Sequence, residues 1–276
     1  MRSLWALYKL SIRQQMHGKR WLVMCLLFLL PAGLAMLVRS NANGARPLEI
    51  EFVFAFMFIP QGLLPLAALV YAPGMIQDEQ EEQTITYLLI RPISKAALYI
   101  VKLLATLTVV IFLTCVFTGV MYTVIYYNFA DPDVPHPAVR CLQAAAINSL
   151  GVTAYCCLFG LMSLLTRRTL IVGVIYAAFF EGLLANLPLS VRLITVIYYT
   201  RIIAYRTMSF VVLRSWGESN IAADAWQLDI ARDPKLLEHP QVGTCILVLT
   251  LASLVLAVLG AVICAKREFH VKTPEK

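Results

Sequence analysis

Three side chains in the segment DPDVPHP are of types that bind metal ions, namely Asp131, Asp133 and His136. The prolines between them favour a short, stiff turn instead. The other histidines of the chain are scattered, with no second ligand three or four positions away. We therefore expect a plain turn at this position and no metal site.

The sequence also lacks the motifs of nucleotide and acyl-transfer chemistry. No G-x-x-x-x-G-K-[ST] occurs, so the chain has no P-loop with which to hold nucleotide phosphates. Ser-His-Asp and Cys-His sites have no recognisable local signature, although such triads need not be local. We expect a protein that works by conformational change rather than by catalysis. We also expect no cofactor bound by the chain itself.

Glu181 lies well inside the apolar run YAAFFEGLLANLPL, and Asn186 follows a little beyond it. A charged side chain at the centre of a bilayer costs about 2.5 to 3.5 kcal/mol. Glu181 should therefore face the interior, carry a proton or pair with a base, for which Arg192 and Arg201 are the candidates. Two roles stay open for Glu181 and Asn186: a pathway or gating site, or a structural hydrogen bond between segments.

The densest group of acids in the chain lies between two long apolar runs and comprises Asp78, Glu79, Glu81 and Glu82. Residues 77–87 contain no proline or glycine, and acids gathered at a helix start suit its partial positive charge. Arg91 precedes Pro92, which ends such a helix, and Ser94 can cap the next one. The pattern predicts a short acidic helix held at the membrane surface.

The composition is that of an integral membrane protein. Hydrophobic residues make up 60% of the chain and charged residues only 14%, with a mean hydropathy of +0.75. A soluble domain carries roughly a quarter charged residues. The net charge of +7 gathers around the ends of apolar runs, without a basic soluble face. We therefore expect contact with the lipid bilayer and no nucleic-acid binding.

Apolar stretches long enough to cross about 30 Å of hydrocarbon recur six times. They are residues 21–38, 52–72, 98–127, 141–165, 169–187 and 242–264. Basic residues of the short loops fall mainly on the side that holds both termini, so both termini should be cytoplasmic. The sequence predicts an all-α integral membrane protein with one transmembrane domain over residues 1–276.

Two further segments are expected outside the six spans. In residues 1–20, Leu4, Leu7, Tyr8 and Ile12 recur at helical spacing, which predicts an amphipathic helix in the cytoplasmic interface. Residues 188–241 form the largest external segment. Its apolar first part, interrupted by arginines, predicts a re-entrant or interfacial helix, and its remainder a polar loop with a short helix.

The seven cysteines lie within or at the ends of apolar runs. We expect them to act as small apolar fillers. Cys141 and Cys245 both fall near the predicted outer face, which leaves a bridge between these two open as an alternative.

The acidic strip resembles a known family. The pattern D-E-x-E-x-x-T-x-x-x-L-L-x-x-P-I-S-K over residues 78–95, followed by Lys102, looks like the permease subunits of type-2 ABC exporters. This chain has Gln83 where that family usually has glycine before the threonine, and Val101 where a glycine often precedes the lysine.

The resemblance implies six spans per subunit, a dimer of permease subunits, and a separate ATPase that docks on the cytoplasmic side with ATP and Mg. It also implies that the loop over residues 73–97 carries a coupling helix. By this resemblance the coupling residues are Asp78, Glu79, Glu82, Thr84, Leu88, Leu89, Pro92 and Lys102.

The sequence thus favours the permease subunit of an ABC exporter in a prokaryotic plasma membrane. The alternative is a scaffold that transmits ATPase motion to an external partner without transport, which the long external segment motivates. A membrane-embedded enzyme would need Glu181 to meet another acid or a histidine, and no such partner is evident in the sequence.

Overall fold

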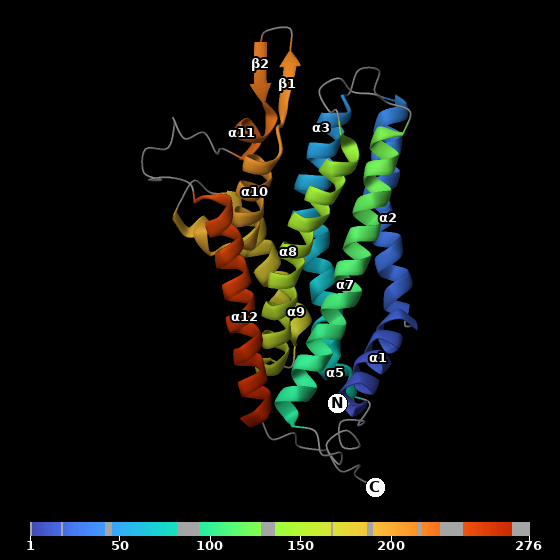
Figure 1. The fold of residues 1–276 in the computed structure, drawn as a ribbon, viewed down its shortest axis with the longest axis vertical. Coiled ribbons are helices and arrows are strands. Elements are labelled where there is room, and N and C mark those ends of the chain that lie inside the picture. The colour runs from blue at the N-terminus through green and yellow to red at the C-terminus, as the bar shows by residue number, and fades with distance from the viewer. Residues whose placement is uncertain are drawn as a thin grey trace.

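The computed structural model describes residues 2–17, 19–41, 46–81, 94–127, 136–166, 168–186, 190–214, 217–226 and 240–266. Long helices run side by side along the longest axis of the molecule (Figure 1). Helix α1 (Arg2–His17) and the last turn of α12 (Val242–Lys266) lie at the same end of this bundle. That arrangement agrees with an even number of membrane crossings.

Six segments of the described chain are long and apolar enough to cross a membrane, which confirms the predicted spans. The first is α2 (Lys19–Asn41), the third α7 (Lys95–Tyr126), the fourth α8 (Pro137–Leu165) and the sixth α12. The second comprises α3 (Pro47–Glu51), η1 (Phe52–Leu63), α4 (Leu64–Tyr71) and part of α5 (Gly74–Glu81). The fifth comprises α9 (Thr169–Tyr176), η2 (Ala177–Leu183) and η3 (Leu184–Asn186).

Local sequence signals explain where several of these helices begin. Proline stands at the first position of α3 and α8, where its missing N–H is not needed. The predicted cap of α7 is confirmed, because the Ser94 hydroxyl accepts a hydrogen bond of 3.3 Å from the backbone N–H of Ala97. η1 contains Pro60 and is wound as a π-helix, a form that interrupts the ordinary ladder of hydrogen bonds.

The predicted N-terminal helix is present as α1, and its apolar side packs on α7. Leu7 is buried there, and the Tyr8 hydroxyl lies 2.8 Å from the hydroxyl of Thr108. Gln15 Nε2 donates to the Thr106 hydroxyl at 2.7 Å. The stripe that the sequence marks as apolar therefore faces a neighbouring helix. The place of α1 relative to the membrane interface stays a prediction.

The segment predicted to be external, residues 188–241, contains η4 (Ser190–Ile194) and α10 (Val196–Thr207), which packs on α8 and α12. A Cβ added to Gly151 in α8 would lie 3.3 Å from Thr200 in α10, so the two helices approach closely. Whether α10 is re-entrant or lies in the membrane interface, as the sequence predicts, stays a prediction.

A β-hairpin that the sequence pattern does not predict follows α10. Strands β1 (Val211–Arg214) and β2 (Gly217–Asn220) pair antiparallel, with Val212 opposite Ser219, and α11 (Ile221–Trp226) follows. The hairpin stands beyond the end of the bundle (Figure 1). Phe210 and Trp226, which flank it, pack against Phe52 of the second span with ring centroids 5.4 and 5.0 Å away.

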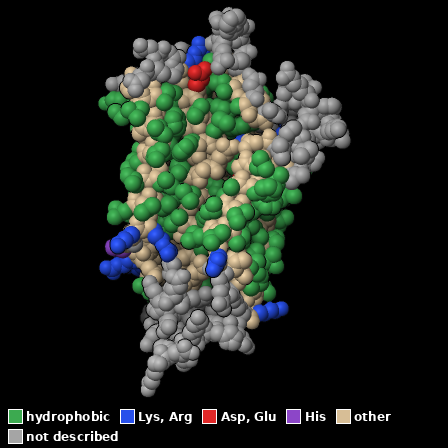
Figure 2. Space-filling model, turned by 180° about the vertical axis from the view of Figure 1, so that it is seen from behind, with side chains coloured by type: hydrophobic (Ala, Val, Ile, Leu, Met, Phe, Trp, Pro, Cys, Tyr) green, Lys and Arg blue, Asp and Glu red, His purple; other side chains and the backbone are tan. Residues whose placement is uncertain are grey.

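Hydrophobic side chains cover the flank of the bundle (Figure 2). Many large apolar residues on α2, α9 and α12 are exposed rather than packed, as expected of helix faces that contact lipid. The buried residues form three clusters along the bundle, of which the largest joins α2, α4, α7 and α8.

Candidate functional site

The acidic strip begins within α5, which starts at Gly74 and is described as far as Glu81. Asp78 and Glu79 therefore lie on a helix, as the sequence predicts. The other proposed strip residues lie outside the described part of the chain: Glu82, Thr84, Leu88, Leu89 and Pro92. The role of all these residues in coupling stays a prediction.

Lys102 connects α5 to the third span. Its side chain is buried, and its Nζ donates a hydrogen bond of 2.8 Å to the backbone carbonyl of Met75. A buried ammonium group needs such a partner, because an unpaired charge away from water is costly. The lysine that the family resemblance marks thus joins the start of the acidic helix to α7.

Gln77 connects α5 to two further spans, and the sequence analysis did not single it out. Its Nε2 donates to the carbonyl of Thr166 at 3.1 Å and to the hydroxyl of Thr169 at 2.8 Å. These threonines stand at the end of α8 and the start of α9. The only sequence signal was a polar side chain directly before the acids. We call the contacts of Met75, Gln77, Lys102, Thr166 and Thr169 the α5 junction.

A close-packed tyrosine extends this junction to the last span. Tyr99, one turn before Lys102, is fully buried between glycines of α8 and α12. A Cβ on Gly160 would lie 2.9 Å from Met75 Cε and 3.2 Å from the Tyr99 hydroxyl, and one on Gly260 would overlap that hydroxyl. Tyr99, Gly160 and Gly260 form what we call the glycine interlock. Through it α7 packs closely against α8 and α12 at this end of the bundle, and α8 packs against α5 at Met75.

Glu181 is fully buried and binds the N-terminus of α10. Its carboxylate accepts hydrogen bonds from the backbone N–H groups of Val196 at 3.0 Å and Ile197 at 3.1 Å. The hydroxyl of Tyr176 donates to it at 3.2 Å. A carboxylate at this position satisfies donors that have no partner within the helix and interacts favourably with the helix dipole. These contacts are the hydrogen bonds that a structural role requires, and a pathway or gating role for Glu181 stays a prediction.

Arg201, one of the two bases expected near Glu181, binds the end of the fifth span. It donates to the side-chain oxygen of Asn186 at 3.0 Å and to the carbonyl of Ala185 at 3.4 Å. Burial lowers the pKa of Arg201 to about 10, which still leaves it charged at neutral pH. Arg192, the other expected base, lies over the ring of Tyr198 at 5.4 Å. Asn186 thus joins η3 to α10.

A second buried carboxylate, Glu51, escaped the sequence analysis. The Tyr122 hydroxyl donates to it at 2.7 Å, Tyr126 donates to its other oxygen, and Arg140 pairs with it at 3.0 Å. Arg140 also donates to the carbonyl of Ser209 and lies over the ring of Phe210 at 5.3 Å. We call Glu51, Tyr122, Tyr126 and Arg140 the Glu51 cluster.

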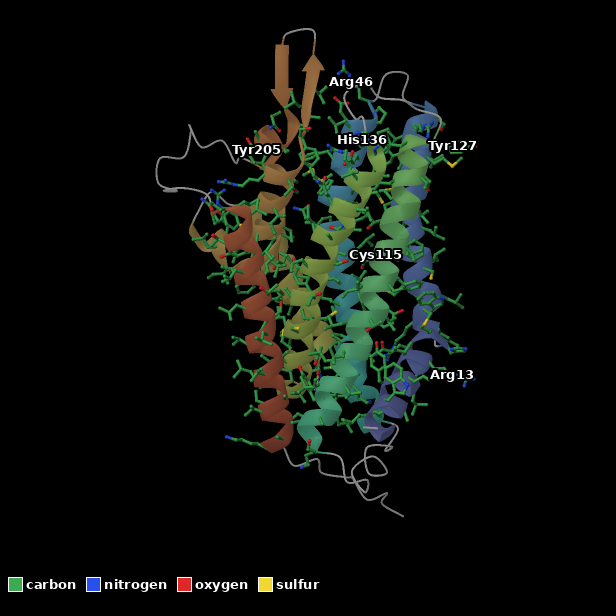
Figure 3. The ribbon with its side chains drawn as sticks, in the orientation of Figure 1. Arg13, Arg46, Cys115, Tyr127, His136 and Tyr205 are labelled. Carbon is green, nitrogen blue, oxygen red and sulfur yellow. The ribbon has the colours of Figure 1, made fainter. Side chains whose placement is uncertain are left out.

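The Glu51 cluster joins the second, third and fourth spans to the segment after α10. It lies at the opposite end of the bundle from α5, near the levels where Figure 3 labels Tyr127 and His136. Nearby, Arg39 at the end of α2 donates to the carbonyls of Val124 at 2.7 Å and of Tyr127. The one sequence signal was an acid directly before an apolar run.

The described contacts link helices and do not assemble reactive groups. Among the residues that the structure describes, no group of three or more His, Cys, Asp or Glu residues could hold a metal ion. Asp131 and Asp133 lie outside those residues, and His136 directly precedes α8. All seven cysteines are free thiols, so Cys141 and Cys245 are not bridged.

Comparison with known proteins identifies the family. A search of curated proteins finds no match. Residues 16–182, more than half of the chain, match the family described as ABC-2 family transporter protein. This stretch contains the first five spans except for a few terminal residues, together with the acidic strip and the α5 junction. The chain belongs to the ABC-2 transporter family and is a multi-pass membrane permease of an ABC transporter.

Proposed function

We propose that this chain is the membrane subunit of an exporter driven by a separate ATPase. Two permease copies, identical or different, enclose the transport path, and the ATPase binds ATP and Mg. The chain lies in the plasma membrane of a prokaryote with both termini in the cytoplasm. Its own role is mechanical, because the free energy comes from the partner.

The α5 junction is the observation that carries this proposal. A force applied to the acidic helix would reach α7 through Lys102 and Met75, and α8 and α9 through Gln77. The glycine interlock extends that path to α12. Since helices are stiff along their axes, a push on α5 would tilt these spans rather than be absorbed locally.

The acidic side chains of the strip suit an electrostatic contact with a basic surface of the ATPase. Charges at the rim of an interface mainly steer the encounter and select the partner. Asp78, Glu79 and Glu82 would supply this contact, and the apolar residues Leu88 and Leu89 would pack it against the membrane face. Pro92 would separate the strip from α7.

The first test is co-purification with a candidate ABC ATPase from the same organism, followed by an ATPase assay. Reversing the charges with Glu79→Lys and Glu82→Lys should weaken docking about tenfold or more, a free-energy change of about 1.4 kcal/mol, or uncouple hydrolysis. Glu49→Lys, at the other end of the bundle, is the matched control and should leave docking unchanged. Wild-type protein that binds no ATPase, or a reversed strip that docks normally, would contradict the proposal.

A scaffold that moves an external partner without transport is the second candidate. The observation in its favour is the external hairpin, which Phe210, Trp226 and Arg140 fasten to the bundle. ATP-driven movement of a panel of fluorescent lipids and dyes across proteoliposomes would support the exporter. ATP-dependent motion of the hairpin without any such flux would support the scaffold.

A further inference from the structure

Basic side chains form a line where α1 meets α2. Lys9, Arg13 and His17 are spaced four residues apart on α1, so they share one face of that helix. Lys19 and Arg20 follow at the start of α2, and all five side chains are exposed. Figure 3 labels Arg13 on the side of α1 away from the other helices, and Figure 2 shows Lys and Arg side chains gathered below the apolar flank. We call these five residues the basic ladder.

The positive charge of the ladder is not balanced within its own segment. The first acid in the sequence is Glu49, so residues 1–48 contain none. α1 is held to α7 through Tyr8, Gln15 and the buried Leu7, none of which is charged. The contacts that fix α1 on the bundle therefore leave its basic face directed outward.

The ladder adjoins apolar side chains that are equally exposed. Trp5 and Leu10 flank Lys9 on α1 and are 68% and 60% exposed, and Trp5 stacks on Tyr8 at 5.4 Å. Leu22 and Leu26, just beyond the ladder on α2, are 70% and 74% exposed. The basic residues thus stand beside exposed apolar side chains on both helices. Phospholipid headgroups occupy that position relative to hydrocarbon.

We propose that the basic ladder binds the phosphate groups of anionic phospholipids. Lys and Arg make charge-assisted hydrogen bonds to phosphate oxygens, and each cation near an anionic surface gives roughly a fivefold preference. An acidic protein surface would suit the charges alone. The exposed Trp5 and Leu10 beside them fit a lipid, whose chains can cover these side chains while its headgroup meets the cations.

The proposal differs from the general tendency of basic residues to stay on the cytoplasmic side. That tendency concerns orientation during insertion and makes no distinction among basic residues of one side. Arg168 and Lys266 are also exposed, at the start of α9 and the end of α12, but neither belongs to the ladder. They provide the matched control. The proposal does not depend on the ATPase.

The test measures how much phosphatidylglycerol the purified full chain retains over phosphatidylcholine, by native mass spectrometry after extraction from a mixed bilayer. We expect Lys9→Gln with Arg13→Gln to reduce the preference tenfold or more. Arg168→Gln with Lys266→Gln should retain it. The swap Lys9→Arg with Arg13→Lys should also retain it, which separates charge from packing. Wild-type preference should fall as salt rises, because exposed charges are screened.

Three results would overturn the proposal. The first is a wild-type chain without preference between the two lipids. The second is an equal loss in the ladder and control variants, which would indicate net charge rather than a site. The third is a ladder variant that keeps its lipid preference but no longer co-purifies with the ATPase, which would make the ladder a protein-docking surface.

Discussion

Two fully buried carboxylates, Glu51 and Glu181, stabilise this bundle in different ways. Glu51 pairs with the guanidinium of Arg140 and accepts from two tyrosine hydroxyls. Glu181 accepts from the first backbone N–H groups of α10. A charge pair and a helix cap respond differently to substitution, which makes the two roles distinguishable.

Glu181→Ala should destabilise the protein by about 2 kcal/mol, since hydrogen bonds to a charged group contribute roughly that much. Glu181→Gln should cost less, because an amide oxygen can still accept from Val196 or Ile197. Hydrogen exchange of residues 196–204 measures the effect directly, and faster exchange should be confined to α10 and its neighbours. Unchanged exchange with altered transport would instead assign Glu181 to the pathway.

Removing the charge of Glu51 leaves Arg140 without its carboxylate. Glu51→Gln should therefore lower stability by about 3 to 5 kcal/mol, the cost of breaking a buried ion pair on one side. Thermal unfolding in detergent measures the change. The double variant Glu51→Gln with Arg140→Met should be more stable than the sum of the single effects predicts. Strictly additive losses would mean that the two side chains do not act as a pair.

At the scale of helices, the close packing at the α5 end of the bundle depends on two glycines, which have no side chains to separate the helices. Gly160 and Gly260 make room for Tyr99, whereas nothing lies within 4 Å of a Cβ added to Gly33, Gly119 or Gly243. Alanine should therefore destabilise the protein at the two crowded glycines and be tolerated at the three open ones. The contrast gives each test a control within the same fold.

Gly260→Ala should destabilise the protein by about 1 to 3 kcal/mol, because the new methyl group overlaps the Tyr99 hydroxyl. Gly243→Ala, at the other end of α12, should be neutral or slightly stabilising, since alanine favours a helix. Tyr99→Leu combined with Gly260→Ala should recover part of the loss. Thermal unfolding of the three variants checks this, and equal effects of the two alanines would disprove the interlock.

Lys102→Met should loosen α5 while leaving the spans folded. Without the ammonium group, the carbonyl of Met75 loses a hydrogen bond. We expect faster hydrogen exchange across residues 74–81, and ATP hydrolysis that no longer responds to the membrane subunit. Lys95→Met, at the start of α7, is the control. If Lys102→Met leaves the exchange of α5 unchanged, this contact does not hold the helix.

For the whole molecule, the sequence predicts those features that depend on neighbouring residues in the chain, such as spans and helix caps. Each span is a run of apolar residues of sufficient length, and the Ser94 cap depends only on residues within one turn. Contacts between distant segments could not be predicted in this way. Glu51 meets Tyr122 and Arg140, which are 71 and 89 positions away, and β1 pairs with β2 in a stretch without alternating hydrophobicity.

Motion should be shared unequally among the helices of the bundle. Spin labels on α7 and α12 should keep a constant distance when the ATPase binds and hydrolyses ATP. The reason is that the side chain of Tyr99, on α7, packs directly against Gly260 of α12. Labels on α2 and α7 should change their distance, since α2 meets α7 without such an interlock. Double electron–electron resonance measures both pairs. A changing distance from α7 to α12 would show that the glycines do not lock these helices.

The glycine interlock should thereby limit how α7, α8 and α12 move relative to one another. We expect these three spans, which it joins, to tilt together as one rigid body. The remaining freedom lies where the backbone is already interrupted, at Pro31 in α2 and at Pro60 in η1. We therefore expect a load on α5 to bend the first and second spans at these two prolines rather than to separate α7, α8 and α12.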